Sequence, residues 1–244
     1  MPGVDLLAQL GAADWINVTP QQLVHAAQRA RFDLFGAASR RALAGDLTAG
    51  NAEVKALLDQ APQARGWVVV NTNYPDRSAE ELKRHVSGSR WLGALLSQGP
   101  AGERLASQAT RDVLQAYRRF TKPVLVSVPN AAAAHDLQEL ATEFSSVKFV
   151  AWGCGGDEWQ DAVLAARQCV NIFLEPCSGG PHRGKIEAIF AALGPNRVLF
   201  ASNYPDQNPG AALGLLLEAK ISDTERQAML AGNAVRLFSL RREE

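Results

Sequence analysis

The chain has 244 residues, 47% of them hydrophobic and 20% charged, and its 25 basic and 25 acidic side chains leave no net charge at pH 7. A balanced charge gives no attraction toward nucleic acid or an anionic membrane surface, so neither is expected as a partner. No apolar run approaches the roughly 20 residues of a membrane span, and the N-terminus does not resemble a signal peptide, which together predict a cytoplasmic protein.

Short runs rich in Val, Leu, Ile and Phe alternate along the chain with longer segments of helical periodicity. These runs are continuously apolar rather than alternating, which is typical of parallel strands that are covered on both faces. The predicted strands are residues 4–10, 32–39, 65–71, 90–96, 123–128, 147–152, 170–175 and 197–202.

Helix start signals and apolar stripes fill the intervals between these strands. Thr19-Pro20-Gln21-Gln22 predicts an N-cap followed by Pro at the first helical position and a capping-box Gln. Ser78-Ala79-Glu80-Glu81 predicts a second start of the same kind. The other predicted helices lie within residues 105–120, 132–144, 159–167 and 185–193, on the stretch ALGLLLEA, and after Ser222.

Eight strand–helix units in a chain of this length favour a (β/α)₈ TIM barrel, one α/β domain over residues 1–244 with an extra C-terminal helix. An open doubly wound sheet is the alternative. No GxGxxG follows any predicted strand and no GxxxxGK[ST] occurs, so the common nucleotide-binding signatures are missing. In a barrel, the residues just past each strand form the active site.

Two stretches, KIEAIFAALGPNRVLFASNYPDQNP and ISDTERQAMLAGNAVRLFSL, resemble the C-terminal part of the amidohydrolase superfamily. The branch includes metal-dependent aromatic-acid decarboxylases, hydrolases and lactonases, whose members typically show G-x-D-R-[VI]-L-F-G-S-D-[YF]-P. GWVVVNTNYP and FVAWGCGG are similar to the third and sixth strands of that branch. The resemblance implies a (β/α)₈ barrel with a metal site at the carboxyl ends of its strands.

The metal-binding positions that the resemblance implies carry other residues in this chain. Where the family reads I-D-x-H-x-H, Leu7 and Gln9 replace the two histidines. Ser127 and Gly153 stand where the fifth and sixth strands usually end in histidine. Asn203 replaces the aspartate that binds metal and serves as base in the family.

A divalent metal such as zinc needs about three or four nitrogen, oxygen or sulfur donors. Leucine and glycine supply none, and a neutral amide or hydroxyl replaces an imidazole or a carboxylate poorly. We therefore predict that the family's metal chemistry is lost and that the protein uses no cofactor. A metal site rebuilt from other residues is the alternative to this prediction.

The remaining polar groups at the strand ends give the candidate site. Cys177 and His182 could form a thiolate–imidazole pair, and Asn203 and Asp206 are the other catalytic candidates. Arg183 belongs to the anion-binding candidate loop Ser178–Lys185, and the other ligand-binding candidates are Asn73, Ser127 and Cys154. Buried, inert cysteines and a plain connecting loop are the simpler interpretations. Arg40 and Arg41 are expected to be solvated, Cys169 to lie in the core, and Trp152 to fill space near Leu7.

Two hypotheses follow for function. In the first, the chain is a non-catalytic barrel protein that binds a small molecule, such as a carboxylate, or forms a homo-oligomer or a complex with an active amidohydrolase-like paralogue. In the second, it is a metal-independent hydrolase or lactonase that uses Asp206 or His182 as base. Whether the chain is an enzyme is left open by the sequence, with the first hypothesis favoured.

Overall fold

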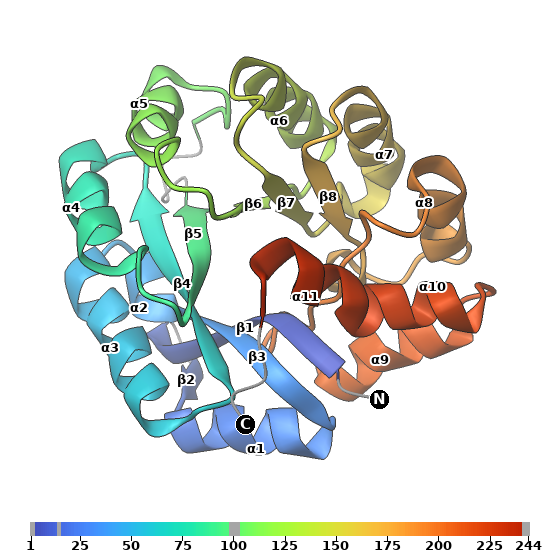
Figure 1. Ribbon diagram of the computed structural model, residues 1–244, viewed down its shortest axis with the longest axis horizontal. Helices are drawn as coiled ribbons and strands as arrows, with labels where there is room; N and C mark the ends of the chain where they lie inside the picture. The colour runs from blue at the N-terminus through green and yellow to red at the C-terminus, as the bar shows by residue number, and fades with distance from the viewer. Residues whose placement is uncertain (1–2, 14–15, 98–102, 241–244) are drawn as a thin grey trace.

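The computed structural model describes residues 3–13, 16–97 and 103–240, and they form an α/β fold around one curled sheet of eight strands (Figure 1). The strand order is β2-β1-β3-β4-β5-β6-β7-β8. All neighbouring strands pair in parallel except β1 and β2, which pair antiparallel. The strands are β1 (Gly3–Ala13), β2 (Ile16–Val18), β3 (Phe32–Ser39), β4 (Ala64–Asn71), β5 (Trp91–Ser97), β6 (Val124–Ser127), β7 (Phe149–Trp152) and β8 (Ile172–Glu175).

The segment 197–204 joins the two ends of this sheet by backbone hydrogen bonds. On one side the Leu199 N–H donates to Leu174 O of β8 at 2.9 Å. On the other side the Leu6 N–H of β1 donates to Phe200 O at 3.1 Å. The predicted strand 197–202 is therefore extended and bonded on both sides, although it makes isolated bridges rather than a regular ladder. The architecture is consistent with a TIM-barrel-like fold.

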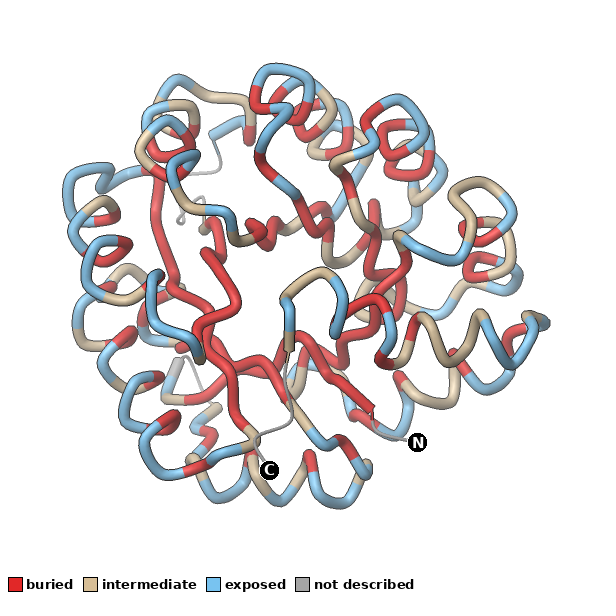
Figure 2. The backbone as a smooth tube through the Cα atoms, viewed as in Figure 1, coloured by how far each residue is buried: buried red, intermediate tan, exposed pale blue. Residues whose placement is uncertain are grey.

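Helices surround the curled sheet on its outside, and their buried sides face the strands (Figures 1 and 2). Thr19 caps the first helix with the predicted capping box, reciprocated by Gln22. The helices are α1 (Pro20–Arg29), α2 (Arg40–Leu43), α3 (Leu47–Gln60), α4 (Pro75–His85), α5 (Gln108–Tyr117), α6 (Ala131–Glu143), α7 (Trp159–Gln168), α8 (Lys185–Leu193), α9 (Pro209–Glu218), α10 (Asp223–Gln227) and α11 (Asn233–Phe238). Two short 3₁₀ helices are η1 (Gly156–Glu158) and η2 (Cys177–Gly179), and the π-helical segment η3 (Ala228–Gly232) connects α10 to α11.

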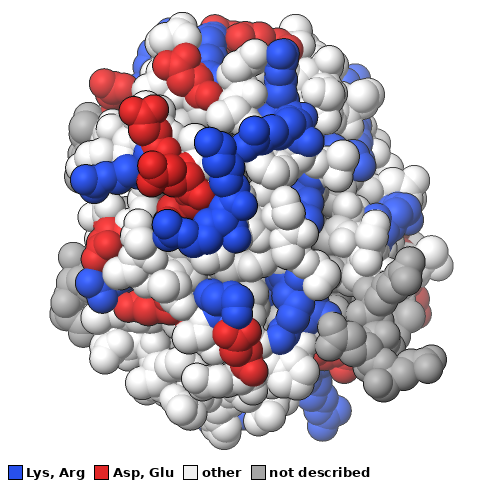
Figure 3. Space-filling model, turned by 60° about the vertical axis from the view of Figure 1, so that its left-hand side comes forward, with Lys and Arg blue, Asp and Glu red and all other residues white. Residues whose placement is uncertain are grey.

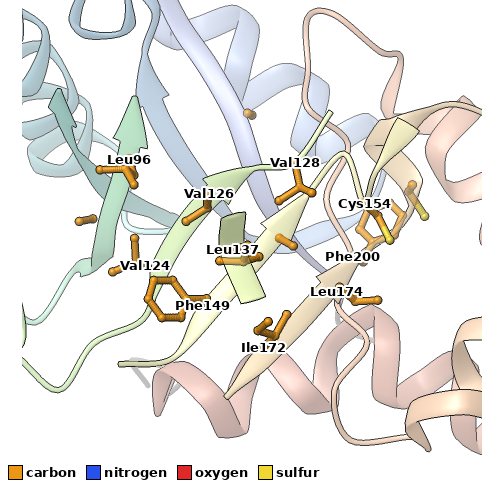
Figure 4. Packing of buried hydrophobic residues seen from close by; sticks show 14 of the residues in the cluster. Leu96, Val124, Val126, Val128, Leu137, Phe149, Cys154, Ile172, Leu174 and Phe200 are labelled. Atoms are coloured by element: carbon orange, nitrogen blue, oxygen red, sulfur yellow. The ribbon is translucent and has the colours of Figure 1, made fainter. Parts of the chain in front are cut away.

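Two apolar clusters form the core. The outer cluster lies between strands and helices, and Figure 4 shows Leu137 of α6 among Val126, Phe149 and other strand residues. The inner cluster combines side chains from strands that are not neighbours, which can meet only inside the curl. Its strand members include Leu7, Val69, Leu95, Leu125, Val150 and Leu199.

The C-terminal helix α11 packs against the inner cluster. The Phe238 ring meets Trp67 of β4 edge-on, with ring centroids 5.6 Å apart. Asn233 Nδ2 donates to the backbone oxygens of Pro195 and Val198, both at 2.7 Å. In Figure 1 this helix lies in front of the central strands, so it covers one end of the curled sheet. The predicted extra C-terminal helix is thus part of the core packing.

One prediction about local structure needs correction, and one element was missed. The helix after β4 begins at Pro75, not near Ser78. Ser78 is buried inside that helix, where its hydroxyl donates to Asn71 O and accepts from Asn71 N–H, both at 2.9 Å. The serine therefore ties α4 to the end of β4. The antiparallel hairpin that β2 forms with β1 was also not predicted, because its strand has only three residues.

The surface carries mixed charge on the face shown in Figure 3, where acidic and basic side chains lie side by side. Arg111 illustrates the pattern, since its guanidinium pairs with Glu139 and with Glu143, the latter at 2.8 Å. Within the parts of the chain that the structure describes, no helix is long and apolar enough to cross a membrane.

Candidate functional site

A polar layer lies on top of the inner apolar cluster, at the carboxyl ends of the strands. Side chains two residues apart on a strand point to the same face, so each residue two positions beyond an inner-cluster member also faces inward. Strand register aligns these residues, pairing Asn71 with Ser97 and Trp152 with both Ser127 and Glu175. The polar layer is Gln9, Asn71, Ser97, Ser127, Trp152, Glu175 and Asn203.

Gln9 and Asn203 are bonded directly to each other. Gln9 Nε2 donates to Asn203 Oδ1 at 2.6 Å, and both residues are buried. Arg40 Nη1 donates to Gln9 Oε1 at 3.1 Å and to Asp206 Oδ1 at 2.9 Å. Gln9 Nε2 also reaches Asp206 Oδ2 at 3.3 Å. The side chains at two positions where the resemblance implies metal ligands are therefore engaged in an internal network of four residues.

The structure corrects the prediction that Arg40 is solvated. Its side chain is only 11% exposed and pairs with Asp206, whereas the side chain of Arg41 is 50% exposed. Ser39, the last residue of β3, caps the short helix α2 and so places Arg40 directly above the polar layer. Sequence reasoning missed this role because an Arg-Arg pair after a strand carries no sign of which guanidinium turns inward.

Asn203 occupies a backbone conformation that few side chains tolerate. Its φ is +54°, in the left-handed region, which Asn adopts more readily than most residues other than Gly. Its N–H donates to Leu7 O at 2.8 Å, which fixes the segment after residue 202 against β1. An amide at this position therefore serves both the local backbone and the hydrogen bond to Gln9.

Leu7 lies below this network and is completely buried in the inner cluster. Trp152 is half-buried and packs against that same cluster. That Trp152 fills space near Leu7 stays a prediction, since the contact is with the cluster as a whole. Apolar packing at Leu7 contributes burial free energy, but it offers no donor to a metal.

Asp5, which sequence reasoning did not select, is a buried carboxyl group on β1 that faces the segment 197–204. Its Oδ1 accepts from the N–H groups of Ser202 at 2.8 Å and Leu7 at 3.2 Å, and its Oδ2 bonds the Ser202 hydroxyl at 2.5 Å. Burial raises the pKa of Asp5 to about 7, against the opposing effect of these hydrogen bonds. Asp5 thus joins β1 to the segment that bridges the sheet ends.

Glu175, at the end of β8, is a second buried carboxyl group that accepts hydrogen bonds from backbone N–H groups. Its carboxylate accepts from the N–H groups of Cys177, Ser178 and Ala201, and it bonds the Ser178 hydroxyl. Burial raises the pKa of Glu175, while the hydrogen bonds from Ser178 and Cys177 oppose that rise. Lys185, the first residue of α8, is only 2% exposed and lies close enough to lower the pKa of Glu175 electrostatically.

The structure does not bring Cys177 and His182 together as a catalytic pair. Cys177 is fully buried, and its burial raises the pKa of the thiol well above its ordinary value. His182 Nε2 instead lies 3.2 Å from Asp157 Oδ1. Burial also raises the pKa of Cys154 to about 12. Both thiols therefore stay protonated near neutral pH, which leaves a thiolate mechanism without physical support. Cys169 lies in the core as predicted.

The other candidates lie away from the internal network. Asn73 is exposed, and its N–H donates to Asn71 Oδ1 at 2.8 Å. Ser127 is half-buried within the polar layer. His182 and Arg183 line a cavity of about 600 Å³ between the loop before α8 and the end of α9. Glu187, Glu218 and Lys220 line the same cavity, so its charge is mixed rather than strongly basic.

The residues present do not fit the metal that the family implies. Among the described residues, no three His, Cys, Asp or Glu side chains gather where they could hold a metal ion. The oxygens of Gln9 and Asn203 already accept hydrogen bonds. The Arg40 guanidinium, which carries a permanent positive charge, donates to the amide oxygen of Gln9 and would repel a cation there.

The model of one protein family, described as amidohydrolase, matches residues 3–240. The chain belongs to the amidohydrolase family. This match spans almost the whole sequence and includes every strand of the curled sheet. No curated protein sequence matches the chain.

Several solved structures of this family share the fold. A 2,6-dihydroxybenzoate decarboxylase from Rhizobium superposes with a TM-score of 0.79 at 14% identity, covering 98% of each chain. A dihydroxybenzoic acid decarboxylase from Polaromonas sp. JS666, solved with bound manganese, gives a TM-score of 0.78 at 16% identity, covering 99% of this chain and 98% of that one. A probable 2-pyrone-4,6-dicarboxylic acid hydrolase from Acinetobacter baumannii, with citric acid bound, gives 0.72 at 14% identity, covering 98% and 100%. At these identities the similarity establishes the fold alone.

Proposed function

We propose that residues 1–244 form one closed (β/α)₈ domain that has lost the family's metal chemistry and acts as a non-catalytic, small-molecule-binding protein. The hydrogen bond from Gln9 Nε2 to Asn203 Oδ1, at 2.6 Å, carries this proposal. In a metal site the oxygens at these positions would have to face a cation, whereas here they accept N–H groups. Arg40 supports the proposal because its guanidinium places a fixed positive charge beside the Gln9 oxygen.

Metal content of the purified, untagged protein tests this proposal directly. We expect less than about a tenth of an equivalent of any transition metal, and no thermal shift when zinc or manganese is added. We also expect no decarboxylation of 2,6-dihydroxybenzoate or 5-carboxyvanillate, the substrates that the names of structural relatives suggest. A stoichiometric metal that survives dialysis would overturn the proposal.

A double variant tests whether the surrounding structure is still arranged to hold a metal. Replacing Gln9 with His and Asn203 with Asp restores two donors while Leu7 stays in place. Because two donors are fewer than the three or four that a protein metal site needs, we expect this double variant to gain little metal affinity. Tight zinc binding by the double variant would show that the surrounding structure is still arranged to hold a metal.

The second candidate is a metal-independent hydrolase that uses Asp206 as base. The observation in its favour is that the Asp206 side chain is 43% exposed and so accessible to solvent beside the polar layer. Against it, one carboxylate oxygen pairs with Arg40 and the other contacts Gln9. Lactone hydrolysis that disappears in Asp206→Asn but persists in Cys177→Ser would favour this candidate.

Assembly with other chains is part of the proposal. In this proposal the barrel serves as a scaffold, either in a homo-oligomer or in a complex with an active amidohydrolase-like paralogue. Light scattering of the purified protein, and of the protein mixed with such a paralogue, measures both outcomes. A strict monomer that forms no complex would leave only the small-molecule-binding part of the proposal.

A further inference from the structure

A groove between α1 and the start of α9 is lined by basic and amide side chains. Its volume is about 380 Å³, and Figure 1 shows the two helices next to each other at the outside of the molecule. The wall on α1 is Gln22, His25, Ala26, Arg29 and Ala30, and the facing wall is Tyr204, Asn208, Pro209 and Gly210. Among the described residues, no acidic side chain lines this groove. Its size is in the range of small-molecule sites.

The helical period brings the polar side chains of α1 to one face. Residues 22, 25, 26 and 29 follow the spacing i, i+3, i+4 and i+7, which places them along one side of the helix. His25 and Arg29 are one turn apart, so their Cβ atoms lie about 5–6 Å from each other. The sequence of α1, PQQLVHAAQR, contains no Asp or Glu that could pair with them.

The hydrogen-bonding groups that remain free in this groove are donors. Within the described parts of the chain, no hydrogen bond or ion pair joins the side chain of His25 or Arg29 to another residue, and solvent reaches both. Gln22 Oε1 accepts the Thr19 N–H, and Asn208 Oδ1 accepts the Gly210 N–H, both at 2.8 Å. These bonds use the two amide oxygens and leave the amide NH₂ groups as donors.

The acidic residue that follows Tyr204 most closely does not neutralise these groups. Asp206 is paired with Arg40, at 2.9 Å between its Oδ1 and Arg40 Nη1. The groove therefore keeps the positive charge of the Arg29 guanidinium, and the His25 imidazole adds a donor when neutral and a second charge when protonated.

We propose that this groove binds a small phosphomonoester. A phosphate group carries about two negative charges and presents three acceptor oxygens, which matches a guanidinium, an imidazole and two amide NH₂ groups on opposite walls. Arginine also binds phosphate through two parallel hydrogen bonds. A carboxylate has a single charge and two oxygens in one plane, so it would leave part of this donor set unused. The Tyr204 ring and Pro209 offer apolar surface to the organic group of the ester. The inference goes beyond the proposed function because it assigns a site to the surface between two helices.

Calorimetric titration of the full-length, untagged protein with phenyl phosphate tests the inference. The comparison anions are phenyl sulfate, which has the same ring but one charge, benzoate, and inorganic phosphate, which has no organic group. We expect phenyl phosphate to bind more tightly than about 1 mM and more tightly than each comparison anion. The titrations belong in about 0.1 M salt, which screens attraction over distances beyond roughly 10 Å.

Three exposed-surface variants locate the binding. Arg29→Gln should weaken phenyl phosphate binding by about tenfold or more, since hydrogen bonds to charged groups are the stronger class. Ala26→Glu places a carboxylate on the same helix face without loss of helix propensity, and it should abolish binding. Arg118→Gln is the matched control, because Arg118 is an exposed arginine at the C-terminal end of α5 and does not line the groove. It removes the same charge and should leave binding unchanged.

Several results would overturn the inference. They are no binding of phenyl phosphate, or binding no tighter than that of any one comparison anion. Equal binding by Arg29→Gln or by Ala26→Glu, when circular dichroism shows the variant to be folded, would also contradict it. An equal loss in Arg118→Gln would mean that net charge alone attracts the ligand. Metal content bears only on the proposed function, so the failure of one proposal is distinguishable from the failure of the other.

Discussion

Replacing Asp5 with Asn should change how the stability of the protein depends on pH. Burial raises the pKa of Asp5 from 3.8 to about 7 in the folded protein. Between these values the folded state holds a proton that the unfolded state releases. The stability that Asp5 contributes is therefore fully present below about pH 3.8 and is lost as the pH rises through about 7.

The size of this effect follows from the pKa shift. A shift of about three units at 1.36 kcal/mol per unit corresponds to roughly 4 kcal/mol, of which about 2–3 kcal/mol falls between pH 5 and pH 8. Asn is a neutral isostere of the protonated acid, and its oxygen can still accept the N–H groups of Ser202 and Leu7 that Asp5 Oδ1 binds. Asp5→Asn should thus remove the part of the pH dependence that comes from Asp5, without removing those bonds.

Urea denaturation of wild type and Asp5→Asn at pH 5, 6, 7 and 8 measures the effect. We expect wild type to lose about 2–3 kcal/mol of unfolding free energy relative to the variant across this range. Asp136 is the matched control. Burial raises the pKa of Asp136, but hydrogen bonds from Arg104 and from the Ala106 N–H outweigh this effect and lower the pKa below its ordinary value. The stability that Asp136 contributes is therefore lost only in acid. The difference between wild type and Asp136→Asn should stay constant above pH 5. Parallel pH curves for wild type and Asp5→Asn would refute the argument.

Three further predictions concern the network, the sheet and the thiols. Arg40→Ala should lower the free energy of unfolding by about 1–3 kcal/mol in urea denaturation because it removes a nearly buried donor from two partners, whereas Arg41→Ala should cost less than about 1 kcal/mol; equal costs would contradict the assigned network. Gly93→Ala should be destabilising by on the order of 1–3 kcal/mol, because its methyl group would lie 1.9 Å from Pro123 O, while Gly214→Ala on α9 meets nothing within 4 Å and should be neutral or stabilising. The three cysteines are buried, so a thiol reagent should label them in the folded protein far more slowly than in urea; rapid labelling of any one would disprove its burial.

The fold could be predicted largely from the sequence. Continuous apolar runs are typical of buried parallel strands. The capping box at Thr19 defines the start of α1 through contacts that span three residues. Such local signals depend on residues that are adjacent or a few positions apart in the sequence. These signals fail at Ser78. The pattern there is that of a helix start, but α4 already begins at Pro75, so Ser78 lies inside the helix and its hydroxyl bonds Asn71.

The site was predicted in part. The change at Gln9 and Asn203 could be recognised from the motifs, but the hydrogen bond between them could not, because 194 residues separate the two side chains. In the sequence, Arg40 looks like an ordinary surface cation, and Lys185 is only the last residue of a candidate anion-binding loop. Only the packed structure buries them, at 11% side-chain exposure for Arg40 and 2% exposure for Lys185.

By itself, the sequence determined that this protein has alternating strands and helices, and it shows Gln9, Ser127 and Asn203 among the positions where the resemblance to the family implies metal ligands. The tertiary structure alone decided how those groups are used. Curling the sheet brings β1 and the segment 197–204 together, so that Gln9 and Asn203 satisfy each other, while Asn71 and Trp152 are left with N–H groups that have no acceptor. Hydrogen bonding depends on distance and direction between groups far apart in the chain, and those are fixed only when the sheet closes on itself.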